Sequence, residues 1–161
     1  MRDNGGAGIV LGVEDKNAIN QNIRVAKNTV ENNQGTGIWL SRFGDGPQRN
    51  IIIESNTVRN NGWGAPDRGD KHFWIPGGIW IHSTQVRGLR VSDNDVADNA
   101  GFQLGWSVTA ARQKDRCSAA VVVDANRVKG ANAAGAVFGW GDNDRVAVND
   151  LDAASFAGCA P

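Results

Sequence analysis

The two histidines of this chain both lie beside residues that could share in acid–base chemistry. His82 directly follows Trp80-Ile81, and His72 ends the charged run that begins at Asp67. An imidazole can remove a proton next to a carboxylate, provided that a cation such as an arginine holds the negative charge that develops. Two carboxylates that flank a bond can instead hydrolyse it. The candidate catalytic residues for these two reactions are His82, Asp70, Asp67 and Arg42.

Tryptophan is the second unusual feature, since the chain has six tryptophans and no tyrosine. An indole offers a flat apolar face for a ring to stack on and an N–H group that can donate a hydrogen bond. We expect a binding surface that combines such faces with polar side chains. Its candidate residues are Trp39, Trp80, Trp63, Trp74, His72, Lys71 and Arg112. The alternative is that loops cover the indoles as a small hydrophobic cluster, and that the charges are ordinary solvated loop charges.

These residues must be positioned by a repeated pattern that occurs four times along the chain. Each repeat has a β-branched residue, an asparagine three places later and a valine two places after that. The four segments are 25–30, 53–58, 91–96 and 123–128. A second phrase follows each of them and reads Gly37-Ile-Trp-Leu40 or Gly78-Ile-Trp-Ile81 in its clearest forms. Repeats of this length made of short alternating segments indicate a solenoid.

Apolar residues alternate with polar ones in these segments, which is typical of half-buried strands and not of helices. If Ile38 and Leu40 point inward, Trp39 points outward, and the same parity turns Trp80 outward. We expect both indoles to be solvent-accessible and to stack in one external row, about 4.8 Å apart along the axis. The same alignment continues this row with Val10, Gln103 and Val137.

The repeated asparagine marks a tight bend between two strands, because asparagine tolerates left-handed backbone and its amide bonds to neighbouring backbone. Stacked coils would place these side chains above one another as a hydrogen-bonded ladder. The ladder residues are Asn28, Asn56, Asn94 and Asn126, and either Asn149 or Leu151 would come next.

The repeats resemble the right-handed parallel β-helix of the pectate-lyase-like superfamily, in which an asparagine ladder occupies a short turn. The resemblance implies an all-β fold, a single-stranded right-handed parallel β-helix of about five coils. We expect residues 1–161 to form one such domain, truncated at its N-terminus, because Gly8-Ile-Val-Leu11 begins in the middle of a repeat. An uncapped first coil predicts end-to-end stacking or missing N-terminal coils.

Insertions in the repeat indicate where a ligand would bind. The ladder asparagines are 28, 38 and 32 residues apart, and the extra residues fall before or after the Gly-Ile-Trp strand, never in the asparagine turn. They lie in residues 60–77, 41–49 and 105–118. Loops would therefore rise on both flanks of one sheet and form a groove. Related β-helix enzymes bind polysaccharide in that groove.

Composition excludes several classes of partner. Lys plus Arg equals Asp plus Glu at 17 each, so nucleic acid and an anionic membrane are not the expected partners. No apolar run is long enough for a transmembrane helix. We expect no cofactor; calcium at 93–95 or 142–144 is the weaker alternative. Cys117 and Cys159 are either two thiols or a disulfide, and the superfamily resemblance favours an extracellular, secreted protein whose signal lies upstream.

The resemblance implies a carbohydrate-active domain that binds and cleaves an extracellular polysaccharide as a lyase or glycoside hydrolase. The alternative is a non-catalytic structural or sugar-binding segment of an adhesin or tail-fibre type protein. No catalytic residue can be transferred from a family motif: the Asn-Thr-Asp and Gly-His-Gly signatures of polygalacturonase-like hydrolases are absent. Trp80-Ile81-His82 only partly matches the Trp-Ile-Asp-His phrase of pectate lyases.

Overall fold

The computed structural model describes most of the chain up to Trp106 and shorter segments beyond it. The described residues are 1–13, 15, 17–41, 46–64, 77–82, 86–100, 102–106, 119–129, 136–140, 145–146, 150–151 and 154–158. The regular elements within these ranges are all strands. No helix there is long and apolar enough to cross a membrane.

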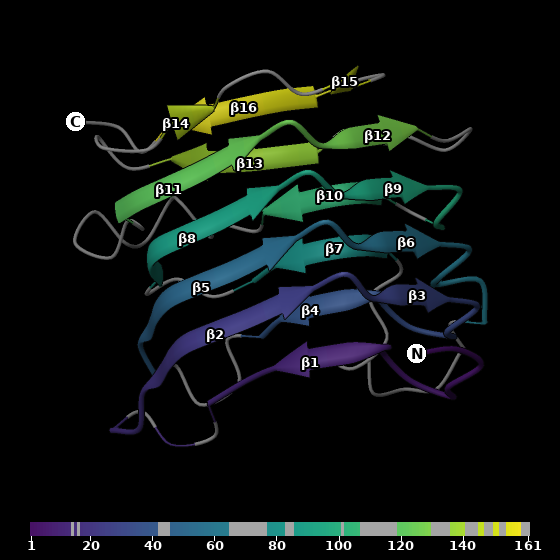
Figure 1. The fold of residues 1–161 in the computed structure, drawn as a ribbon, viewed down its shortest axis with the longest axis horizontal. Helices are drawn as coiled ribbons and strands as arrows, with labels where there is room; N and C mark the ends of the chain where they lie inside the picture. The colour runs from purple at the N-terminus through teal and green to yellow at the C-terminus, as the bar shows by residue number, and fades with distance from the viewer. Residues whose placement is uncertain are drawn as a thin grey trace.

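Successive coils add one strand to each of three parallel sheets, which rise from the N-terminal to the C-terminal end of the stack (Figure 1). Sheet I consists of β1 (Ile9–Leu11), β4 (Ile38–Leu40), β7 (Gly77–Ile81) and β10 (Phe102–Trp106). Sheet II consists of β2 (Asn20–Ala26), β5 (Gln48–Glu54), β8 (Val86–Ser92), β11 (Ala119–Asp124) and β14 (Arg145–Val146). Sheet III consists of β3 (Thr29–Glu31), β6 (Thr57–Arg59), β9 (Asp95–Ala97), β12 (Arg127–Lys129) and β15 (Asp150–Leu151). A separate pair is formed by β13 (Ala136–Trp140) and β16 (Ala154–Gly158).

The expected all-β parallel β-helix is confirmed by this topology. Each strand pairs in parallel with the equivalent strand of the next coil, as Ile9 does with Ile38 and Ile38 does with Ile79. The number of coils stays a prediction, because the chain beyond Trp106 is described only in part.

The core lies between the three sheets and consists of the inward residues of each strand. Ile38, Leu40, Ile79 and Ile81 are fully buried in sheet I, as the alternation predicted. Sheets II and III contribute aliphatic residues in the same way, among them Ile51, Ile53, Val58, Leu89, Val91 and Val96. Burial of such side chains is the main stabilising contribution to the coil stack.

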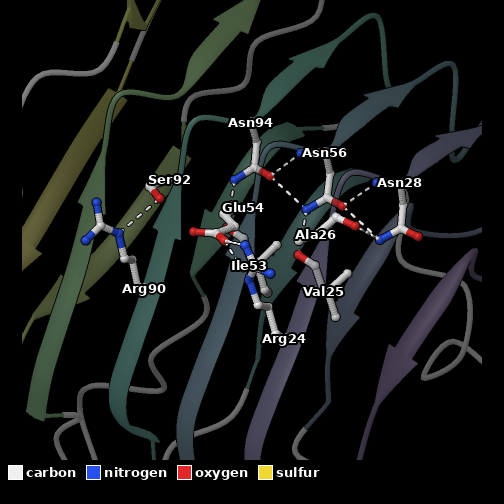
Figure 2. A network of polar contacts seen from close by, with 10 residues as sticks. All are labelled: Arg24, Val25, Ala26, Asn28, Ile53, Glu54, Asn56, Arg90, Ser92 and Asn94. Carbon is white, nitrogen blue, oxygen red and sulfur yellow. Dashed lines mark hydrogen bonds and ion pairs between the residues drawn. The ribbon is translucent and has the colours of Figure 1, made fainter.

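The asparagine ladder is confirmed at the corner between sheets II and III (Figure 2). The backbone and side-chain nitrogens of Asn56 both donate to Asn94 Oδ1 at 3.0 Å, and Asn28 makes the same contacts with Asn56. Asn94 in turn donates to Asn126. Leu151 pairs with Val128 inside a strand, so Leu151 does not occupy the ladder position.

The sequence suggested that the asparagine itself is the left-handed residue of this corner. In the structure, the residue before the asparagine has that conformation. Positive φ values near 55° occur at Lys27, Ser55, Asp93 and Ala125. This residue turns the chain from sheet II into sheet III, and the ladder asparagine then bonds to the next coil.

A second ladder, which the sequence analysis missed, occupies the corner between sheets III and I. Asn33, Asn61 and Asn99 are buried and bond in series, and Asn4 extends the series at the N-terminal side. Asn33, Asn61 and Asn99 each again follow a left-handed residue. The signal was present, because these three asparagines each lie five residues after a ladder asparagine of the first corner.

The second ladder explains the glycine of the Gly-Ile-Trp phrase. A Cβ on Gly37 would lie 2.5 Å from Val58 Cγ1 and 2.9 Å from Asn61 Nδ2, and Gly8 and Gly78 have equivalent surroundings. The core valine and the ladder asparagine therefore leave no room for a side chain at this position.

The N-terminal residues hydrogen-bond to the edge of β3 that faces away from β6. The Met1 amino group donates to Thr29 O, and Asp3 N donates to Glu31 O. Among the described strands, β1 and β2 are the first members of sheets I and II. Whether the chain associates through them stays a prediction.

Candidate functional site

The outward residues of sheet I form a short row across the first coils. The strand register places Val10 beside Trp39, Trp39 beside Trp80 and Trp80 beside Gly105. We refer to these four residues as the outer row. The prediction that Trp39 and Trp80 occupy equivalent positions on the outside of one sheet is confirmed, because their strand neighbours are the buried core isoleucines and leucine.

The alignment that placed Gln103 in this row was wrong. Leu104 pairs with Ile79, so Gly105 is the residue beside Trp80 and Gln103 is the residue beside Gly78. The Gln103 side chain is buried and belongs to the second ladder, where its Oε1 accepts from the backbone and side-chain nitrogens of Asn99. Gln103 thus ends the ladder from within the same coil as Asn99.

Trp39, Trp80 and His82 form one aromatic cluster on the outer face of β4 and β7. The rings of Trp80 and His82 stack with centroids 4.8 Å apart, and the Trp39 ring lies 6.5 Å from Trp80 and 6.3 Å from His82. The backbone positions His82 for this, since His82 N donates to Leu40 O and continues the sheet one residue past β7. The expectation that His82 lies beside Trp80 is therefore confirmed.

The accessibility predicted for the cluster was wrong for Trp39. Its side chain is only 7% exposed, whereas Trp80 and His82 are partly exposed. The Trp39 Nε1 atom is also buried, and it has no hydrogen-bond partner within the described part of the chain. Parity turned this indole outward, but parity does not determine what covers the outer face.

Trp63 is exposed to 60% and lies at a different place in the coil. Its Nε1 donates to Asp98 O at 3.0 Å, at the corner between sheets III and I. The described residues provide no contact between Trp63 and the aromatic cluster, and its role in binding stays a prediction.

The remaining candidate residues lie outside the described residues. They are Arg42, Asp67, Asp70, Lys71, His72, Trp74 and Arg112, together with Cys117, Cys159 and the 142–144 segment. Their expected roles stay predictions.

The positions of the insertions relative to the sheets are as the sequence indicated. The long connections join β6 to β7, β4 to β5 and β10 to β11, so they enter or leave sheet I. The connections from β2 to β3, β5 to β6, β8 to β9 and β11 to β12 contain two residues each, as Ser55-Asn56 and Asp93-Asn94 do. Sheet I is therefore the sheet flanked by additional chain at both ends of its strands.

Charged residues on the outer faces of sheets II and III mostly form ion pairs between coils. Arg24 pairs with Glu54 (Figure 2), and Arg90 pairs with Asp124 at 3.7 Å. Asp95 contacts both Arg59 and Arg127. The hydrogen bond from Arg127 and the charge of Arg59 together lower the pKa of Asp95, and burial opposes this only in part.

These contacts bear on the calcium site considered at 93–95. The Asn94 amide belongs to the ladder, and the Asp95 carboxylate is held by two guanidinium groups. Among the described residues, no group of three or more metal-binding side chains comes together.

Comparison with known proteins identifies the architecture. The family model described as "right handed beta helix region" matches residues 1–114 of the chain. No curated protein and no solved structure gave a significant match.

Proposed function

Because the chain belongs to the right-handed β-helix family, we propose that it is a carbohydrate-binding domain that holds an extracellular polysaccharide on the outer face of sheet I. The observation that carries this proposal is the partly exposed stack of Trp80 and His82 beside Trp39. A sugar ring stacks on an indole face, and an imidazole at its edge can donate a hydrogen bond to a hydroxyl group or accept one from it.

The three aromatic residues have different roles in this proposal. Trp39 is the buried support that fixes the orientation of Trp80, because the two residues are register partners on adjacent strands. Trp80 provides the ring face that the sugar contacts. Gly105, its neighbour on the other side, has no side chain to occupy the space beside the indole.

Catalysis is a second candidate function, and the position of His82 favours it. Its ring lies directly against that of Trp80, so a sugar held on the indole would have the imidazole within reach. In a lyase, His82 would be the base, and Arg42 would hold the developing charge. In a hydrolase, Asp67 and Asp70 would be the carboxylates.

The burial of Trp39 favours a small binding site centred on Trp80 and not an open platform of several indoles. It is also compatible with the non-catalytic alternative, a sugar-binding or structural segment of an adhesin or tail-fibre type protein. Turnover separates these functions from an enzyme.

A panel of acidic and neutral polysaccharides tests the proposal by calorimetric titration and by assay for new reducing ends or unsaturated products. Trp80→Ala should weaken binding by about 1–3 kcal/mol. Ile52→Ala, an outward change on sheet II, is the matched control and should leave binding unchanged. His82→Ala should weaken binding less than Trp80→Ala does and should abolish any turnover. Absence of binding to every polysaccharide would refute the proposed function.

A further inference from the structure

We propose that Arg49 and Arg87 form a binding site for an oxyanion, a sulfate or carboxylate group, on the outer face of sheet II. This site is separate from the outer row of sheet I and does not depend on the function proposed there.

The strand register places the two arginines side by side. Arg49 of β5 is the direct partner of Arg87 of β8, and adjacent parallel strands are about 4.8 Å apart. Both residues are exposed, and both follow fully buried inward residues, Gln48 and Val86. The two guanidinium groups therefore leave the same face of the sheet from neighbouring positions.

The backbone after the two arginines is fixed by a stacked kink. Asn22, Asn50 and Gly88 all have positive φ at equivalent positions of β2, β5 and β8. Asn50 Nδ2 donates to Asn22 Oδ1 at 3.1 Å, and a Cβ on Gly88 would lie 2.8 Å from Asn50 Oδ1. The kink repeats from coil to coil, so it holds Arg49 and Arg87 in the same orientation.

The charge of these two arginines is not compensated by any described residue, in contrast to that of other arginines on sheets II and III. Arg24, Arg59, Arg90 and Arg127 each pair with a carboxylate. Arg49 and Arg87 have no ion pair with any described residue, and their neighbours in the row, Gln21 and Ala119, are neutral. Like charges directly opposite one another destabilise a sheet.

The chemistry of two adjacent guanidinium groups selects the ligand. Each presents a planar set of N–H donors that fits the oxygens of a carboxylate, sulfate or phosphate, and together they can hold several oxygens of one group. An oxyanion bound between them would also relieve the repulsion between the coils. The group can belong to a free ion or to an acidic polymer.

Titration of the whole chain with dextran sulfate, sodium sulfate and uncharged dextran at constant ionic strength tests the site. Arg49→Gln and Arg87→Gln should each weaken the anion complex about tenfold. Arg24→Gln removes the same charge from an arginine that already pairs with Glu54 of the next strand, so it is the matched control and should leave binding unchanged. Binding of dextran sulfate alone would identify a polymer-borne group, and equal site occupancy by sodium sulfate would identify a free ion.

Arg87→Glu provides an independent readout. It should abolish anion binding and raise the thermal midpoint at low salt, because the introduced carboxylate would lie directly beside Arg49 on the neighbouring strand and pair with it. Trp80→Ala should not change anion binding, which separates this site from the outer row. The proposal is overturned if the three glutamine variants bind dextran sulfate with equal affinity. It is also overturned if the affinity of Arg87→Glu for dextran sulfate equals that of the wild-type chain.

Discussion

At the scale of single residues, the ladder asparagines satisfy the polar groups of a buried corner. Asn94 Nδ2 donates to Ile53 O, and Asn94 Oδ1 accepts from both nitrogens of Asn56 (Figure 2). Asn94 Nδ2 also donates to Asn126 Oδ1. No side chain without an amide can replace both functions. The position of the asparagine in the repeat was therefore sufficient to predict this ladder.

Asn94→Ala should lower the free energy of unfolding by about 1–3 kcal/mol, because it leaves buried backbone groups of Ile53 and Asn56 without partners. Chemical denaturation measures the change. Asn17→Ala, at an exposed position in the β1–β2 connection, is the control and should have little effect. A loss of only a few tenths of a kcal/mol for Asn94→Ala would contradict the role of the ladder.

Asp95 couples stability to pH. Its pKa in the folded chain is lower than in the unfolded chain, mainly because Arg127 donates a hydrogen bond to it. The stabilisation is therefore fully present above the ordinary aspartate pKa of about 4 and is lost as pH falls through the lowered folded value.

Asp95→Asn should make stability less dependent on pH in this acidic range, as measured by thermal midpoints between pH 2 and pH 6, roughly the range over which a paired aspartate titrates. Asp93→Asn is the control, because Asp93 is exposed and asparagine also tolerates its left-handed backbone. The same acid dependence in Asp95→Asn and the unchanged chain would contradict the assignment.

Single residues also show where sequence reasoning failed. Alternation predicted correctly which side of the sheet Trp39 occupies, since its neighbours Ile38 and Leu40 are buried. It could not predict that Trp39 is 7% exposed, because alternation gives the side of the sheet that a residue occupies and not what packs against that side. The candidate site was therefore predicted in location and only partly in accessibility.

At the scale of elements, the strands were predictable and their register was not in every coil. The repeats indicated the correct order of strands within a coil. Gln103 was misplaced because Gly101-Phe-Gln-Leu104 looks like a Gly-Ile-Trp phrase, whereas packing places Leu104 beside Ile79. Burial of Leu104 in the core and the hydrogen bonds of the Gln103 side chain in the second ladder together determine the register, and they outweigh the apparent match to the repeat.

Gly37→Ala tests the packing at the start of β4. The added Cβ would collide with Val58 and Asn61, so we expect a loss of roughly 1–3 kcal/mol in unfolding free energy. Gly5→Ala is the matched control, because no atom lies within 4 Å of the position that its added methyl group would take. Equal stability of the two variants would contradict the tight corner.

At the scale of the whole molecule, the described strands at the N-terminal side of sheets I and II have unpaired edges. Edge strands of this kind favour association. We expect the isolated chain to self-associate with rising concentration in sedimentation velocity experiments. Val10→Lys, on the first strand of sheet I, should reduce association by adding a charge; a clean monomer at all concentrations would contradict the expectation.

The central claim is that the outer face of sheet I binds a polysaccharide through Trp80. The most direct measurement is an NMR titration of the six indole N–H resonances, assigned by single tryptophan substitutions, with a polysaccharide that binds in the panel. We predict that the Trp80 resonance shifts most, and that Trp80→Ala removes the shifts of the remaining resonances. An unchanged Trp80 resonance in the presence of saturating polysaccharide would contradict the claim.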